Sequence, residues 1–198
     1  KLEEASLLPA KIVKSQVFGK QFHTICSGGA YLDPSYIDMF KKYDIIIQQG
    51  YGMTECAPVI SVNQSWNIRS DSVGQLLPNC EAKTVDGELW VKGSSVMQGY
   101  YKMPEETAET LEDGWLKTGD LGYVDEDGFV YLTGRKKNLI ITKNGENVSP
   151  EELENALSIN RLVGEVLVRE KGGVIEAEIY PDQDYVKKKR IKDVRAKL

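Results

Sequence analysis

The first sixty residues alternate between apolar runs and glycine-containing breaks. The runs Phe22–Cys26 and Ile45–Gln49 predict two strands, the first of them short and buried. Glycines follow each run, at Ser27–Ala30 and at Gly50–Gly52. Between the runs, Pro34–Tyr43 predicts a helix with proline in its first turn. This order is typical of a parallel α/β sheet, in which ligands bind beyond the carboxyl ends of the strands.

The pattern before and after this stretch is different. In residues 1–20, four apolar positions predict one face of a helix: Ile12, Val13, Val17 and Phe18. From Ser61 onward the chain shows short strands separated by Gly and Asp turns, which predicts an antiparallel, barrel-like unit ending near Thr133. The strands expected there include Glu81–Val85, Glu88–Lys92, Leu121–Val124 and Phe129–Leu132, with turns at Asp86-Gly87 and Asp127-Gly128. Pro104–Leu111 predicts a short helix among them.

The last third of the chain predicts a second α+β unit. A strand at Leu139–Ile141 leads to a turn at Asn144-Gly145. Ser149 is expected to cap a helix that runs to Leu157, with Glu152 completing a capping box. Val163–Val168 and Val174–Tyr180 then predict a hairpin. A polar helix is expected from Asp182 onward.

Composition narrows the class of protein. The chain has 198 residues and a formal net charge of −5, which argues against a nucleic-acid partner. Its three cysteines, Cys26, Cys56 and Cys80, are far apart and form no CxxC pair. They predict neither a disulfide framework nor a zinc site, and they fit a reducing, cytoplasmic compartment. No apolar run approaches the ~18 residues that a transmembrane helix requires.

Four short motifs carry the chemistry, and they come in a fixed order. They are Tyr51-Gly52-Met53-Thr54-Glu55; Gly87-Glu88-Leu89-Trp90-Val91 with Gly99-Tyr100; Thr118-Gly119-Asp120; and Gly134-Arg135-Lys136-Lys137, followed by a Gly turn at Gly145. In sequence and spacing they resemble the adenylate-forming, or AMP-binding, superfamily of acyl-CoA synthetases, peptide-synthetase adenylation domains and firefly luciferase. The style of the motifs is most similar to AMP-forming fatty-acyl-CoA ligases. The resemblance extends from about Cys26 to Val168.

The resemblance implies a domain organisation. Residues 1–60 would end the α/β part of a large domain, and residues 61–133 would form its antiparallel β-barrel subdomain. Residues 134–137 would be a hinge, and residues 138–198 a truncated small α+β domain. The family's phosphate loop and its adenylation lysine have no counterpart in this sequence. The chain is therefore expected to be a C-terminal fragment, inactive by itself.

The first motif and the segment Gly28–Ala30 concern the nucleotide. Gly52 can let backbone approach a ligand closely, and Tyr51 offers an aromatic face beside Met53. Thr54 can bond a phosphate oxygen, and Glu55 is a hard oxygen ligand suited to Mg²⁺ on ATP. The resemblance gives Glu55 that metal role and places Gly28, Gly29 and Ala30 against adenine, although glycines after a strand can also form only a tight turn.

The later motifs concern ribose, the hinge and coenzyme A. A carboxylate such as Asp120 can accept hydrogen bonds from both ribose hydroxyls, or it can merely close an Asx turn. Arg135 can bond ribose or phosphate, or form a surface ion pair. By resemblance Lys137 is the hinge residue about which the small domain swings between two half-reactions. Gly145 would line the channel for the pantetheine of CoA, where Asn147 replaces a frequent arginine.

Three functions remain open from the sequence. The favoured one is a fatty-acyl-CoA ligase that uses ATP, a fatty acid and CoA with Mg²⁺, either in solution or peripheral to a membrane. The second is an amino-acid adenylation domain that loads a carrier protein; these usually carry Asp where this chain has Lys137. The third is a non-catalytic homologue that binds a nucleotide or a partner. The length of the acyl chain and the oligomeric state cannot be read from the sequence.

Overall fold

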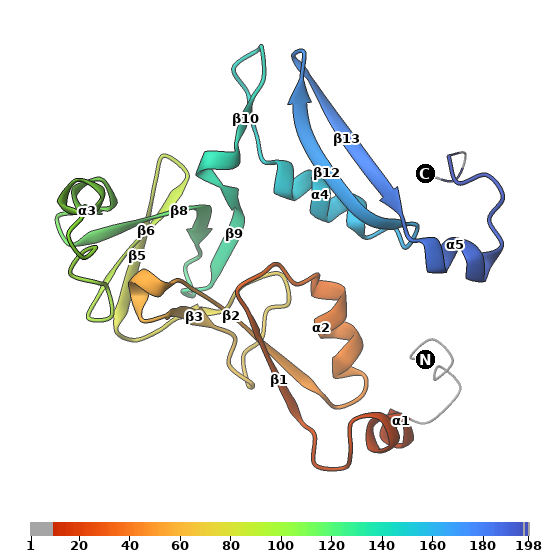
Figure 1. The fold of residues 1–198 in the computed structure, drawn as a ribbon. Coiled ribbons are helices and arrows are strands. Elements are labelled where there is room, and N and C mark those ends of the chain that lie inside the picture. Colours follow the sequence, from red (N-terminus) through yellow and green to blue (C-terminus); the bar gives the residue numbers. More distant parts are fainter. Residues whose placement is uncertain (1–9, 196, 198) are drawn as a thin grey trace. The chain divides into compact units, whose positions relative to one another are not determined.

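The computed structural model describes residues 10–195 and 197 (Figure 1). The chain divides into two compact units. The first comprises the residues up to Thr118 together with Gly122–Leu132, and the second comprises Gly119–Leu121 together with the residues from Thr133 onward. Helices and strands are mixed throughout, which confirms the predicted α/β and α+β class. The division at residues 134–137 stays a prediction.

The first unit begins with the expected strand–helix–strand element. After α1 (Ala10–Val17) come β1 (Thr24–Gly28), α2 (Pro34–Lys41) and β2 (Ile46–Gly52). β1 and β2 are parallel, from Thr24 opposite Ile46 to Gly28 opposite Gly50. Asp33 caps α2 by accepting from the Ser35 N–H at 2.8 Å, and Pro34 follows it. β3 (Val59–Val62) and β4 (Gln75–Leu76) extend the sheet in the order β1-β2-β3-β4.

Two expectations about burial in this region were wrong. β1 alternates between exposed and half-buried residues because it is the end strand of this sheet. In α1 only Val13 of the expected apolar face is buried, whereas Ile12 and Val17 are exposed. Lys14 is buried instead, since its Nζ donates to Asp44 Oδ2 at 2.9 Å and to the Asp44 carbonyl at 2.7 Å. A paired ammonium can be buried where an unpaired one would be too costly.

The rest of the first unit confirms the barrel-like sheet. Its strands are β5 (Cys80–Val85), β6 (Glu88–Gly93), β7 (Leu111–Glu112), β8 (Trp115–Val124) and β9 (Val130–Arg135). They lie in the order β5-β6-β8-β7, with β9 paired to β8, and α3 (Pro104–Thr110) precedes β7. The β5–β6 turn has positive φ at both Asp86 and Gly87, as its Asp-Gly sequence predicts. The core between the sheets contains Tyr51, Cys56, Ile60, Cys80, Leu89, Val91, Leu116 and Val130.

The described residues of the second unit form two hairpins and two α-helices. β10 (Ile140–Ile141) and β11 (Asn147–Val148) flank the Gly145 turn, and α4 (Pro150–Ser158) leads to β12 (Val163–Lys171) and β13 (Val174–Pro181). α5 (Gln183–Lys189) follows, capped by Asp182. α4 lies along the long hairpin (Figure 1), where Glu154 accepts the Val168 N–H at 2.8 Å.

Two local predictions in this part of the chain were also wrong. Ser149 is the N-cap of α4, but no capping box forms: its Oγ donates to Glu151 at 3.0 Å, and Glu152 is exposed. Thr118-Gly119-Asp120 is not a turn between elements but lies inside β8. Gly119 has φ +72° there, so a left-handed residue interrupts the strand without ending it.

Candidate nucleotide site

The two glycine segments of the first unit lie at one edge of its sheet. Because β1 and β2 are parallel with Gly28 opposite Gly50, the carboxyl ends of both strands meet there. Gly28, Gly29 and Ala30 are exposed, and Gly29 has φ +82°. The sheet therefore brings the segment proposed for adenine beside the Tyr51 motif, at the edge where open α/β sheets bind ligands.

Gly52 is required by the chain itself. It ends β2 at a register shift against β3, and a Cβ on it would lie 1.9 Å from the Pro58 carbonyl oxygen. The Met53 N–H donates to that same oxygen at 2.7 Å. Tyr51 is 9% exposed and belongs to the hydrophobic core. The backbone that Gly52 admits is thus that of Pro58, and contact of Gly52 and Tyr51 with a nucleotide stays a prediction.

Glu55 is held by a residue to which the sequence had assigned no role. Thr54 and Glu55 begin a short 3₁₀ turn, η2 (Thr54–Cys56), in which Thr54 is exposed and Glu55 half-buried. The Tyr100 hydroxyl donates to Glu55 Oε1 at 2.8 Å, and the Met97 N–H donates to the Glu55 carbonyl at 2.8 Å. The hydrogen bond to Glu55 is the main reason that the pKa of Tyr100 is raised. Gly99-Tyr100 was visible as a motif, but only the fold connects it to Glu55.

Asp120 and Arg135 form the second cluster, in the second unit. Arg135 Nε donates to Asp120 Oδ1 at 2.8 Å, and the Asp120 side chain is only 8% exposed while that of Arg135 is 53% exposed. Pairing with a cation lowers the cost of burying a carboxylate. The ion pair joins the third and fourth motifs, which are fifteen positions apart and meet because β9 pairs with β8.

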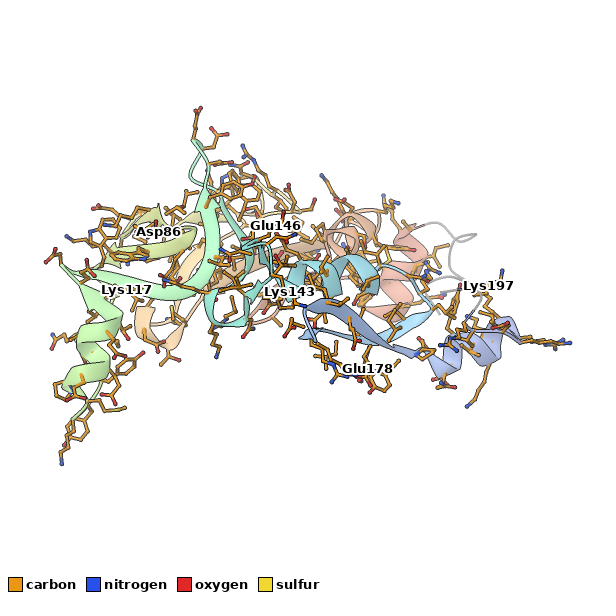
Figure 2. All side chains as sticks on the ribbon, turned by 90° about the horizontal axis from the view of Figure 1, so that it is seen from above. Asp86, Lys117, Lys143, Glu146, Glu178 and Lys197 are labelled. Atoms are coloured by element: carbon orange, nitrogen blue, oxygen red, sulfur yellow. The ribbon has the colours of Figure 1, made fainter. Side chains whose placement is uncertain are left out.

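Lys137 and Gly145 take no part in this ion pair. Lys137 is the exposed centre of a 3₁₀ turn, η3 (Lys136–Asn138). Gly145 has φ +81° in the β10–β11 turn, and a Cβ there would meet nothing within 4 Å. Lys143, which is labelled in Figure 2, precedes Gly145 by two positions. Its Nζ donates to the Gly172 carbonyl of the next hairpin at 3.2 Å. The roles of Lys137 as a hinge and of Gly145 toward CoA therefore stay predictions.

A metal site made by protein alone is not found among the described residues, since no three His, Cys, Asp or Glu side chains there are grouped to hold an ion. Mg²⁺ on ATP does not require such a group, because it is commonly held by one or two carboxylates together with phosphate oxygens and water. Glu55, half-buried and oriented through a single oxygen by Tyr100, fits that requirement.

Comparison with known proteins decides the family. The profile described as "AMP-binding enzyme" matches residues 4–101. A long-chain-fatty-acid–CoA ligase of Salmonella typhimurium is 45% identical over 130 residues, which are 60% of this chain and 23% of that protein. The corresponding ligase of Bacillus subtilis is 41% identical over 160 residues, which are 72% of this chain and 28% of that protein. The chain belongs to the adenylate-forming, AMP-binding superfamily.

Solved structures agree with this assignment. O-succinylbenzoate coenzyme A synthetase from Bacillus subtilis in complex with AMP superimposes with a TM-score of 0.72 and 32% identity, over 84% of this chain and 39% of that one. The same enzyme in complex with ATP and magnesium ion gives a TM-score of 0.72 over 86% of this chain and 40% of that one. This AMP-binding chain spans about a quarter of the length of the curated relatives it matches, from 23% to 30%. None of its described helices is long and apolar enough to cross a membrane.

Proposed function

We propose that the protein carrying this chain is an AMP-forming acid–thiol ligase. It activates a fatty acid as acyl-AMP with release of pyrophosphate, and then transfers the acyl group to the thiol of coenzyme A. The long-chain-fatty-acid–CoA ligases among the relatives support the acid class. The neighbour crystallised with ATP and magnesium ion supports the nucleotide and the metal. Three free cysteines fit the reducing cytoplasm as the location, where the enzyme would work in solution or at the inner face of a membrane.

The buried Asp120–Arg135 pair is the observation that carries this proposal. Asp120 accepts from Arg135 Nε through Oδ1, and because each carboxylate oxygen has two lone pairs, the side chain could also accept a ribose hydroxyl. Arg135 pairs with that carboxylate and would offer its remaining N–H groups to ribose or phosphate. Because both half-reactions use the AMP moiety, both depend on this pair.

The other candidate residues divide between the two half-reactions. Gly28, Gly29 and Ala30 with Tyr51, Gly52 and Met53 would border the adenine, and Thr54 would donate to a phosphate oxygen. Glu55, oriented by Tyr100, would hold Mg²⁺. When bound, the ion neutralises charge on the phosphates of ATP. Lys137 would serve as the hinge within residues 134–137, and Gly145 would border CoA in the second half-reaction.

The test is an assay of the longer protein. With ATP, Mg²⁺ and CoA it is expected to form thioesters from long-chain fatty acids and not to load amino acids onto a carrier protein. Preference for amino acids would make it an adenylation domain instead. Nucleotide binding without product from any acid would point to the non-catalytic homologue. The 198-residue chain alone is expected to show no ATP–pyrophosphate exchange, because the phosphate loop and the adenylation lysine have no counterpart in it. Measurable exchange would contradict this expectation.

Asp120→Ala tests the carrying observation directly. Loss of one charge-assisted hydrogen bond costs about 1.5–3 kcal/mol, which is roughly tenfold to a hundredfold in kcat/KM for ATP. The loss is expected in adenylate formation and in thioester formation alike. Asp71→Ala is the matched control, because Asp71 is exposed. Unchanged kinetics in Asp120→Ala would reduce Asp120 to a structural role.

A further inference from the structure

The first turn of α4 presents one carboxylate to the segment Gly134–Asn138. Asn138 Nδ2 donates to Glu151 Oε1, and Ser149 Oγ donates to Glu151 Oε2 at 3.0 Å. Both oxygens of Glu151 are therefore engaged, one by the segment that precedes β10 and the other by the N-cap of the helix. All of these residues lie in the second unit.

The backbone of the same segment also contacts this carboxylate. Burial raises the pKa of Glu151, but hydrogen bonds from Asn138, its own backbone N–H, Ser149 and the Arg135 backbone N–H outweigh burial and hold the pKa below its usual value. Two residues of the segment, Arg135 and Asn138, thus donate to Glu151 from opposite ends of the 3₁₀ turn η3.

Gly134 shows how tightly the segment passes the helix. It has φ +156°, and a Cβ on it would lie 2.2 Å from Ser149 Oγ and 3.3 Å from Glu151 Oε2. No side chain can be accommodated there unless the cap moves. In contrast, Lys137 is exposed at the centre of the turn and Glu152, the next residue of α4, is exposed as well.

We propose that Glu151 is a latch for the hinge. Its carboxylate holds Arg135 and Asn138 on either side of Lys137, so the dihedral angles at Lys137 can change only when these hydrogen bonds open. Glu151 thereby sets how readily the chain passes between the two arrangements that the half-reactions need, a consequence that rests on the proposed function. Glu151 contacts no substrate in this role and is a positioning residue.

Limited proteolysis of the 198-residue chain tests the latch without any enzymatic activity. Trypsin cleaves after Arg135, Lys136 and Lys137, and cleavage inside a hydrogen-bonded turn follows its local opening. Glu151→Ala is expected to speed cleavage at these three positions about fivefold or more, relative to cleavage after Lys189 in the same chain. Glu152→Ala, which changes the adjacent carboxylate, is expected to leave the ratio within about twofold.

A second variant protects the test against loss of the helix. Asn138→Ala removes one donor and leaves α4 intact, and it is expected to raise the same cleavage ratio by a smaller factor. Circular dichroism melting of each variant checks the fold. If Asn138→Ala and a folded Glu151→Ala both show the same cleavage ratio as Glu152→Ala, the latch is absent. If Glu151→Ala does not fold, Asn138→Ala alone decides.

The longer ligase then shows whether the latch matters for turnover. Glu151→Ala is expected to change the ratio of the two half-reaction rates about fivefold or more, with KM for ATP unchanged, while Glu152→Ala changes neither. Loss of both half-reactions by the same factor would make Glu151 a purely structural residue and overturn the proposal for the hinge. If the longer protein makes no thioester while the proteolysis result holds, the proposed function fails and the latch on the turn stands.

Discussion

Cys56 and Cys26 illustrate at the residue scale how the fold separates two side chains of one type. Cys56 is fully buried in the core, and burial, with Cys80 and Glu55 nearby, raises the pKa of its thiol to about 11. Cys26 is exposed on the edge strand β1. At pH 8 only about one Cys56 thiol in a thousand would be ionised, and the thiolate is the reactive form.

We expect iodoacetamide at pH 8 to label Cys26 in the folded chain at least about a hundredfold faster than Cys56. In denaturant both residues should react at similar rates, which is the internal control. Peptide mass spectrometry after timed quenching measures each site separately. Similar rates in the folded chain would mean that the core around Cys56 opens frequently.

At the scale of an element, the junction of β2 and β3 depends on a single glycine, Gly52. The register shift at Gly52 exists because Pro58 comes back against the strand, and the absence of a Cβ allows it. Gly52→Ala should cost about 1–3 kcal/mol of unfolding free energy, as overpacking does. Gly128→Asn is the matched control, because Gly128 has φ +82° in open space and asparagine tolerates that conformation.

Urea unfolding of the chain measures both Gly52 and Gly128 variants. The control is expected to lose less than about 1 kcal/mol. Equal losses would mean that the strand end relaxes around the added methyl group. If Gly52→Ala were as stable as the parent chain and the longer protein bearing it bound ATP poorly, the nucleotide role of Gly52 would be supported in place of the structural one.

At the scale of the whole molecule, the question is how two compact units are joined. Lys137→Pro would fix φ near −65° and remove an N–H. In the longer protein we expect it to leave acyl-AMP formation largely intact and to slow thioester formation far more, because under the proposed function only the second step requires a changed backbone at Lys137. Lys137→Ala, which removes the charge but leaves the backbone free, should affect both steps little. Pyrophosphate release and transfer from preformed acyl-AMP to CoA measure the steps separately, and equal losses would move the hinge elsewhere in Gly134–Asn138.

Local elements were predicted well where the cause is local. Asp86-Gly87, Asp127-Gly128 and Asn144-Gly145 are turns because their backbone needs positive φ, which Gly adopts at no steric cost. Pro34 and Pro150 begin helices because proline fits the first helical position. The parallel pairing of β1 with β2 also followed, since a helix connects the two strands.

Burial and side-chain pairing were predicted less well. The apolar residues Ile12 and Val17 are exposed, whereas Lys14 is buried because Asp44, thirty positions away, receives its ammonium. The expected capping box at Ser149 does not form, because Glu151 rather than Glu152 receives the hydroxyl and also serves Asn138. The Lys14–Asp44 pair and the Asn138–Glu151 hydrogen bond join residues thirty and thirteen positions apart, so a local window of sequence does not contain both partners.

The sequence by itself determined the family, the order of the motifs and the identity of Glu55, Asp120 and Arg135 as candidates, because these depend on residue types and their spacing along the chain. Tertiary structure alone decided that Tyr100 donates to Glu55, that Arg135 pairs with Asp120, and that Asn138 donates to Glu151. The physical reason is the same in each case. A hydrogen bond or ion pair depends on distances of about 3 Å between atoms, and only strand pairing and helix docking bring such distant residues that close.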